Sequence, residues 1–273
     1  KKMFETLKNA FKVKEIRKKI FIMLALLLVY RIGCYIPVPG LRSSVFSEYV
    51  EDGGNNFLAL MSAVTGGALA NGTLFALGIG PYINASIIMQ LLAVGIPALE
   101  RLSKQGEEGK KKIATYTRIL TLVLAIVQAI GVIINFASTR NAINFTYFWD
   151  QEWLTYIYMA VVYTGGAMIT MWLGERITEY GVGNGISMII FIGIISTAGN
   201  QLIIAPIQNT VESGFSASTL VSTIVFIVIA IVIFALIVLV DLAERRIPVQ
   251  YAKQVKGRKM YGGQATVIPI KIS

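Results

Sequence analysis

The chain has no histidine and one cysteine, Cys34, among its 273 residues. Without histidine it lacks the commonest protein metal ligand and the usual general base at neutral pH. A lone cysteine excludes a disulfide within these residues. Charged residues make up only 15% of the sequence against 55% hydrophobic residues, which is too little charge for a water-soluble surface of this size. We therefore expect a membrane protein without a metal site or cofactor.

Charged groups are also scarce inside the long hydrophobic runs, where Arg31 is the only one. Catalysis and ion coupling within a membrane rely on buried ionisable groups. The sequence has no carboxylate pair inside a run, no HExxH motif and no GxxxxGK[ST] nucleotide loop. These shortages predict that the chain is not an enzyme and that energy for any transport comes from a partner.

The lysines and arginines that are present fall in alternate gaps between the hydrophobic runs. Eight precede Ile20, six lie from Pro97 to Arg118, one is Arg176, and seven follow Val240. Membrane insertion retains lysine and arginine on the cytoplasmic side, so this distribution predicts a cytoplasmic N-terminus. The net charge of +10, gathered on one side, favours contact with anionic lipids or a docked partner.

Six hydrophobic runs approach the ~20 residues that a helix needs to cross a bilayer. They cover residues 20–36, 74–96, 119–136, 154–173, 186–207 and 220–240. The sequence thus predicts an all-α polytopic membrane protein with four regions. These are a cytoplasmic amphipathic segment (1–19), the first five transmembrane helices (20–207), the sixth helix region (208–243) and a basic cytoplasmic loop (244–273). Segment 1–19 also fits a simple basic tail that orients the chain.

The predicted external loop, residues 37–73, contains an apolar stretch at 57–69. This stretch is too short to span a membrane and too apolar for a loop in water, so it fits a re-entrant or buried helix. A helix lying flat on the outer membrane surface fits equally well. In either case Gly66 and Gly67 are expected to end the helix.

Two isoleucine pairs have helical spacing near the start of the second and fifth spans. Ile83 and Ile87 share one helix face, as do Ile186 and Ile190. Small residues around each pair would leave the branched side chains projecting, although ordinary packing explains such pairs as well. Gln128 is the strongly polar residue in the middle of the third span, where it could bind another helix or its own backbone.

Five long motifs carry a resemblance to a known family. They are RIGCYIPVPG (31–40), GIGPYINASIIMQLL (78–92), ERLSKQGEEGKKK (100–112), MWLGERITEYGVGNGISMIIF (171–191) and ERRIPVQYAKQVKGRKMYGGQATVIPIK (244–271). In this order they resemble the SecY family of channel subunits of the bacterial protein translocase. The resemblance implies a SecY-like helical bundle of ten helices in two inverted halves around an hourglass pore. This chain matches the first half, the sixth helix and the following cytoplasmic loop.

The resemblance also implies roles for individual residues. The re-entrant segment 57–67 resembles the plug of the channel, with Phe57, Leu58, Leu60, Met61, Val64, Gly66 and Gly67 as its residues. Four positions match the pore ring: Ile83, Ile87, Ile186 and Ile190. Gln128 matches the polar cluster of the lateral gate. The basic loop matches a docking surface for partners, formed by Arg245, Arg246, Lys253, Lys256, Arg258 and Lys259.

A SecY-like chain is expected in the cytoplasmic membrane as the passive pore subunit for secretory polypeptides. It would release apolar segments sideways into the lipid. Its implied partners are the SecE and SecG subunits, the SecA motor or the ribosome, the translocating polypeptide and anionic lipids. The remaining SecY helices would belong to the same or another chain. Two alternatives are half of a secondary transporter with a midplane substrate site, favoured by the Gly/Pro-interrupted spans, and a docking scaffold.

The predicted topology places Asn71 and Lys110 on opposite sides of the membrane. With Cys34 replaced by serine, single cysteines at these two positions should react with an impermeant maleimide from the outer and the cytoplasmic side, respectively. Labelling of both positions from one side would contradict the six-span arrangement.

Overall fold

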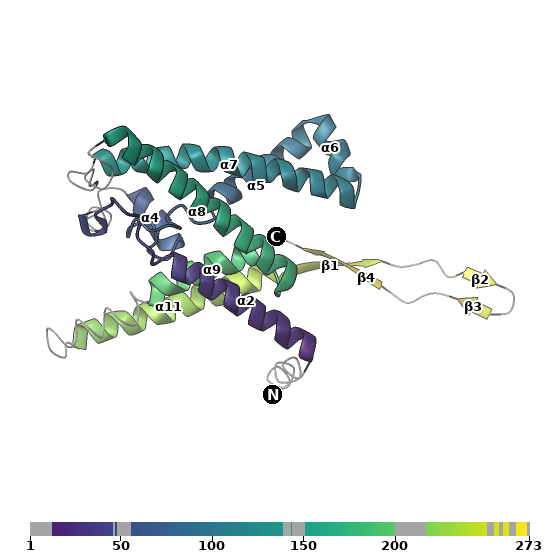
Figure 1. Cartoon of the computed structure of the whole chain (residues 1–273). Coiled ribbons are helices and arrows are strands. Elements are labelled where there is room, and N and C mark those ends of the chain that lie inside the picture. Colours follow the sequence, from purple (N-terminus) through teal and green to yellow (C-terminus); the bar gives the residue numbers. More distant parts are fainter. Residues whose placement is uncertain are drawn as a thin grey trace. The chain divides into compact units, whose positions relative to one another are not determined.

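The computed structural model describes residues 13–45, 47, 56–138, 143, 151–199, 217–249, 254–256, 259–261 and 266–271. The chain divides into two compact units, Lys1–Gly199 and Asn200–Ser273. The described residues are mostly helical (Figure 1), and the predicted class of helical membrane bundle is confirmed.

Besides a helical turn at residues 43–45, the described part of the first unit contains seven helices with defined bounds. They are α2 (Lys14–Gly33), α4 (Asn56–Val64), α5 (Gly80–Gly95), α6 (Pro97–Lys104), α7 (Glu107–Ser138), α8 (Glu152–Tyr180) and α9 (Gly185–Gly199). Each of the first five predicted spans overlaps one of these helices. The boundaries differ, because α5 begins at Gly80 rather than at residue 74. Helix α2 begins at Lys14, so the boundary predicted after residue 19 lies inside a continuous helix, while residues 1–12 lie outside the described part.

Among the described residues, α7 and α8 are each long and apolar enough to cross a membrane alone. Helices α5 and α6 form a third candidate as a pair bent by 101°. The bend lies at Ile96, whose backbone is extended because Pro97 follows it and disfavours the helical conformation. For α2, α9 and α11, the crossing of the membrane therefore stays a prediction from the sequence.

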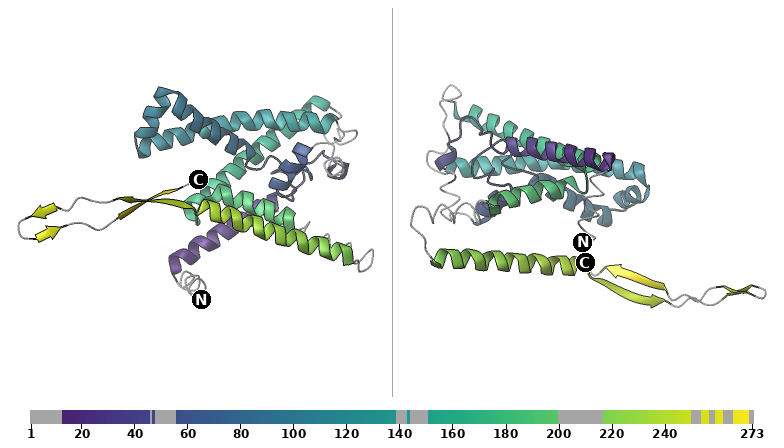
Figure 2. Two further views of the ribbon diagram at one scale, coloured as in Figure 1. Left: turned by 180° about the vertical axis from the view of Figure 1, so that it is seen from behind. Right: turned by 90° about the horizontal axis from the view of Figure 1, so that it is seen from below.

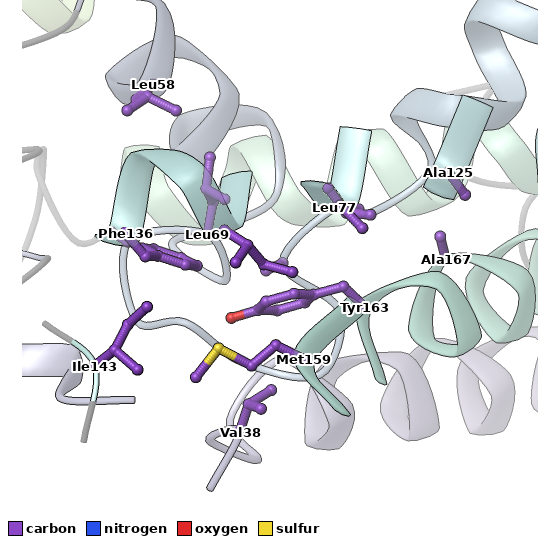
Figure 3. Packing of buried hydrophobic residues seen from close by; sticks show 14 residues of the cluster. Val38, Leu58, Leu69, Leu77, Ala125, Phe136, Ile143, Met159, Tyr163 and Ala167 are labelled. Carbon is purple, nitrogen blue, oxygen red and sulfur yellow. The ribbon is translucent and has the colours of Figure 1, made fainter. Parts of the chain in front are cut away.

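The core of the first unit consists of two hydrophobic clusters. The first joins α7 and α8, where the ring centroids of Phe136 and Tyr163 lie 6.1 Å apart and Met159 is fully buried (Figure 3). The second cluster joins α2, α8 and α9 and includes Tyr30, which stacks on Phe75 with ring centroids 5.7 Å apart. Helix faces buried in this way determine how α2, α7, α8 and α9 pack.

Residues 65–79, here called the buried turn segment, connect α4 to α5 without forming a helix. Most of this segment is buried, and its backbone is paired with the loop after α2. Val38 donates to the Gly72 carbonyl (3.1 Å), and Leu74 donates to the Ile36 carbonyl (2.9 Å). Irregular backbone at membrane depth requires such internal partners, because lipid offers no hydrogen bonds. A hydrophobic run alone did not distinguish this segment from a helix.

The second unit contains α11 (Ala217–Asp241) and two antiparallel strand pairs (Figures 1 and 2). Strand β1 (Glu244–Val249) pairs with β4 (Thr266–Lys271), and β2 (Gln254–Lys256) pairs with β3 (Lys259–Tyr261). The sixth predicted span thus corresponds to α11. The strands were missed in the basic loop, although the β-branched run in β4 is the kind of sequence that favours a strand.

Alanine substitutions at two neighbouring glycines of α8 can test how closely the helix approaches the buried turn segment. A Cβ atom on Gly166 would overlap the Leu74 carbonyl, whereas a Cβ on Gly165 meets nothing within 4 Å. Gly166→Ala should therefore destabilise the fold by about 1–3 kcal/mol through overpacking. Gly165→Ala should be neutral or stabilising by up to about 1 kcal/mol, since alanine favours a helix. Thermal unfolding of the purified complex in detergent measures both, and equal midpoints would contradict the close approach.

Candidate functional site

A cavity of about 660 Å³ lies inside the first unit, between α2, α4, α5, α7, α9 and the buried turn segment. Its lining is mainly apolar. It brings together residues that the sequence analysis assigned to three separate features, namely Leu58, Met61 and Val64 of the plug, Ile83 and Ile190 of the pore ring, and Gln128.

Helix α4, the predicted plug, is too short to span a membrane and packs against α9. It ends in a Schellman motif, in which Gly67 donates to the Ser62 carbonyl (2.8 Å) and Gly66 donates to the Ala63 carbonyl (3.3 Å). Gly66 and Gly67 have φ of +71° and +85°, a backbone conformation that glycine adopts most readily. The predicted end of the helix at these glycines is confirmed.

The side chains of α4 differ in their surroundings. Leu58 is buried and lines the cavity with Met61 and Val64, whereas Leu60 is 66% exposed. Phe57 belongs to α4, but its side chain lies outside the described part. The buried face and the contact with α9 fit a helix enclosed by protein better than one lying on the membrane surface.

The four predicted pore-ring isoleucines divide into two groups. Ile83, Ile186 and Ile190 are half-buried and pack against the second hydrophobic cluster. Ile83 and Ile190 also line the cavity, while Ile186 lines a smaller pocket beside it. Ile87, one turn after Ile83, is 50% exposed and does not line either space.

The start of α9 is held by polar contacts that the sequence analysis missed. The Asn184 side-chain oxygen accepts a hydrogen bond from the Ile186 backbone (3.0 Å), and the Thr178 hydroxyl accepts one from Gly185 (2.9 Å). A Cβ on Gly185 would overlap the Gly174 carbonyl of α8. These contacts fix α9 on α8 and so place Ile186. An asparagine just before an apolar run was the available signal.

An ion pair joins α7 and α8 next to the smaller pocket. The Arg118 Nε lies 2.9 Å from a Glu175 carboxylate oxygen, and Tyr82 also lines this pocket. Both charged side chains remain partly exposed, so the pair contributes at most about 1 kcal/mol to stability. It does mark the polar end of an otherwise apolar bundle.

The predicted docking residues lie in the second unit. Arg245 and Arg246 are exposed in β1. Lys256 of β2 and Lys259 of β3 are direct partners in the strand register. Lys253 and Arg258 lie outside the described residues.

The described part of the chain contains no group of three or more Cys, Asp and Glu side chains arranged to hold a metal ion. The lining of the cavity is mainly apolar, and its polar side chains include the carboxamides of Asn84, Gln128 and Asn135.

The fold is similar to part of the fold of solved channel structures. It is similar to the solved structure described as "The structure of a protein conducting channel", with a TM-score of 0.64 and 23% identity over 95% of this chain and 54% of that one. It is also similar to Sec61 in the canine ribosome-channel complex from the endoplasmic reticulum, with a TM-score of 0.61 and 22% identity over 92% of this chain and 54% of that one.

Sequence comparison narrows this class to one family. The SecY family model matches residues 73–273. The chain is 41% identical to the SecY subunit of the protein translocase from Streptomyces galbus, over 99% of this chain and 62% of the relative. It is 42% identical to that of Staphylococcus carnosus, over the same shares. The chain belongs to the SecY family and spans about three fifths of the length of these relatives.

Proposed function

We propose that this chain forms part of the pore subunit of a protein-conducting channel in the cytoplasmic membrane. The observation that carries the proposal is the cavity, in whose wall α4 meets Ile83 and Ile190. The passenger would be an unfolded secretory polypeptide, and α4 would act as the plug that closes the path. The energy would come from a partner, because the sequence contains no nucleotide-binding loop of the GxxxxGK[ST] type.

Apolar side chains suit such a conduit for two physical reasons. A constriction lined by isoleucine binds water weakly, so it dewets and resists ion leakage at rest. Isoleucine also makes no directional hydrogen bonds, so the same constriction can yield to a passing side chain of any kind. Selective channels instead need fixed polar ligands, which the lining of this cavity largely lacks.

The cavity also borders α5 and α7, which match one side of the family's lateral gate. Gln128 of α7 lines the cavity at this side, near Gly80 of α5. A polar side chain here would stabilise the closed gate through hydrogen bonds between helices. An apolar passenger segment would leave through the gate into lipid, favoured by about 25 cal/mol per Å² of buried apolar surface.

The basic strands of the second unit would dock the partner that drives transport. The related proteins are named as translocase subunits, and one similar structure is a ribosome-channel complex. By this likeness the partners would be SecE, SecG and either SecA or the ribosome, on the cytoplasmic side. The exposed Arg245 and Arg246 fit a surface that meets acidic protein or ribosomal RNA. Anionic lipids would hold the same cations between encounters.

The seal can be tested at the cavity wall. Ile190→Ser in the complete channel should raise resting ion leakage severalfold, because a hydroxyl in the constriction retains water. Ile195→Ser provides the control on the same helix, since Ile195 is 51% exposed and does not line the cavity. The measurement is the anion permeability of vesicles that contain the purified complex. Unchanged leakage for Ile190→Ser would show that Ile190 does not contribute to the seal of the pore.

The docking surface can be tested by charge reversal at Arg245, Arg246, Arg258 and Lys259. Binding of the motor or ribosome to vesicles should weaken by about tenfold or more, since each exposed ion pair contributes up to about 1 kcal/mol. The control reverses four exposed cations of α6 and α7 instead, at Arg101, Lys110, Lys111 and Lys112. Equal losses in both variants would indicate a general charge effect. Undiminished binding at moderate salt would exclude this loop as the docking surface.

A further inference from the structure

Arg31 is the charged residue of the predicted first span, and the proposed function gives it no role. In the structure it is half-buried near the end of α2. Its two terminal nitrogens bind different elements. Nη1 donates to the Gly66 carbonyl (3.4 Å), and Nη2 donates to the Ser196 hydroxyl of α9. The guanidinium also lies 5.2 Å from the centre of the Tyr35 ring. Arg31 therefore bridges three elements that are far apart in the sequence.

The Gly66 contact lies where α4 ends. The last carbonyls of a helix have no partner within the helix and carry the negative end of its dipole. The Schellman motif satisfies the carbonyls of Ser62 and Ala63. The guanidinium adds a positive charge and a donor to the turn that follows, so it stabilises the C-terminal end of α4 in this position.

The same end of α4 lies directly against the backbone of α9. A Cβ on Gly193 would overlap the Val64 carbonyl, and a Cβ on Gly66 would lie 3.1 Å from the Gly193 Cα. The Thr197 hydroxyl donates to the Ala63 carbonyl (3.2 Å). Since Ser196 and Thr197 are adjacent, the Arg31 contacts and the Thr197 hydrogen bond all lie at the C-terminal end of α4. Two glycines facing one another allow this close approach.

We propose that Arg31 is the positioning residue that keeps α4 in the cavity wall. It does so because its guanidinium donates hydrogen bonds to both the Gly66 carbonyl and the Ser196 hydroxyl. The inference rests on the proposed function of α4 as the plug. A planar guanidinium can donate to two separate acceptors at once, whereas a lysine ammonium acts as a single point charge. The bridge therefore depends on arginine itself and not only on a positive charge. Opening requires the Gly66 and Ser196 contacts to separate.

The test uses the complete channel complex purified from cells that encode each substitution and placed in vesicles. Arg31→Gln should raise resting anion leakage about tenfold, since loss of a charge-assisted hydrogen bond shifts the seated population by about 1.4 kcal/mol. Arg31→Lys should raise it as well, because the second contact is lost. Arg42→Gln is the matched control, as Arg42 is an exposed arginine on the same predicted side and takes no part in these contacts.

A cross-link measures the position of α4 directly. With Cys34 replaced by serine, cysteines at Ala63 and Thr197 should form a disulfide efficiently when Arg31 is present and poorly after Arg31→Gln. If Arg31→Gln prevents assembly, Ser196→Ala decides the matter, since it removes one acceptor and leaves the charge. Unchanged leakage and unchanged cross-linking in the assembled variants would overturn the proposal.

A deletion separates this inference from the proposed function. Removal of residues 57–66 should itself raise leakage, and Arg31→Gln should then add nothing, because Arg31 acts through α4. If Arg31→Gln raises leakage in the deleted channel as much as in the complete channel, Arg31 does not act through α4. The proposal for Arg31 would then be wrong, while the proposed plug function of α4 would stand. If the deletion has no effect on leakage, the plug function fails, and the inference fails with it.

Discussion

The first unit depends on irregular backbone being enclosed by helices. The buried turn segment crosses the interior with isolated turn hydrogen bonds instead of a continuous helical series, and each unsatisfied polar group there would cost several kcal/mol in lipid. Pairing with the loop after α2 satisfies part of this backbone, and Gly166 lets α8 lie against it. Helices α2 and α8 are thus held in place by a segment that is not itself a helix.

This constraint connects the features of the cavity. The buried turn segment leaves α4 at one end and enters α5 at the other, so the position of the proposed plug and that of Ile83 are linked through a short length of chain. On the other side, α9 carries Ile190 and contacts the end of α4 through Gly193. Apolar side chains form the wall of the cavity, and a few polar contacts at helix ends fix the positions of the helices that carry them.

Much of the fold could be predicted from the sequence. Long apolar runs predicted the helices, and Gly66 and Gly67 predicted the end of α4, because few other residues tolerate that conformation. The start of α5 could not be predicted, since residues 74–79 are apolar in a buried turn as they would be in a helix. The strand pairs of the basic loop were also missed. In β1 and β4 the described side chains are mostly exposed, so no buried apolar face marks these strands in the sequence, and their pairing joins residues that are well separated along the chain.

The sequence by itself determined the membrane class, the family and the approximate positions of most helices. These follow from composition and local pattern, which act over a few residues. Only the tertiary structure decided that Ile83 and Ile190 line the cavity while Ile87 does not, and that Arg31 reaches Gly66 and Ser196. Those contacts depend on the rotation and offset of packed helices, which close glycine contacts and helix caps set across long separations in the chain.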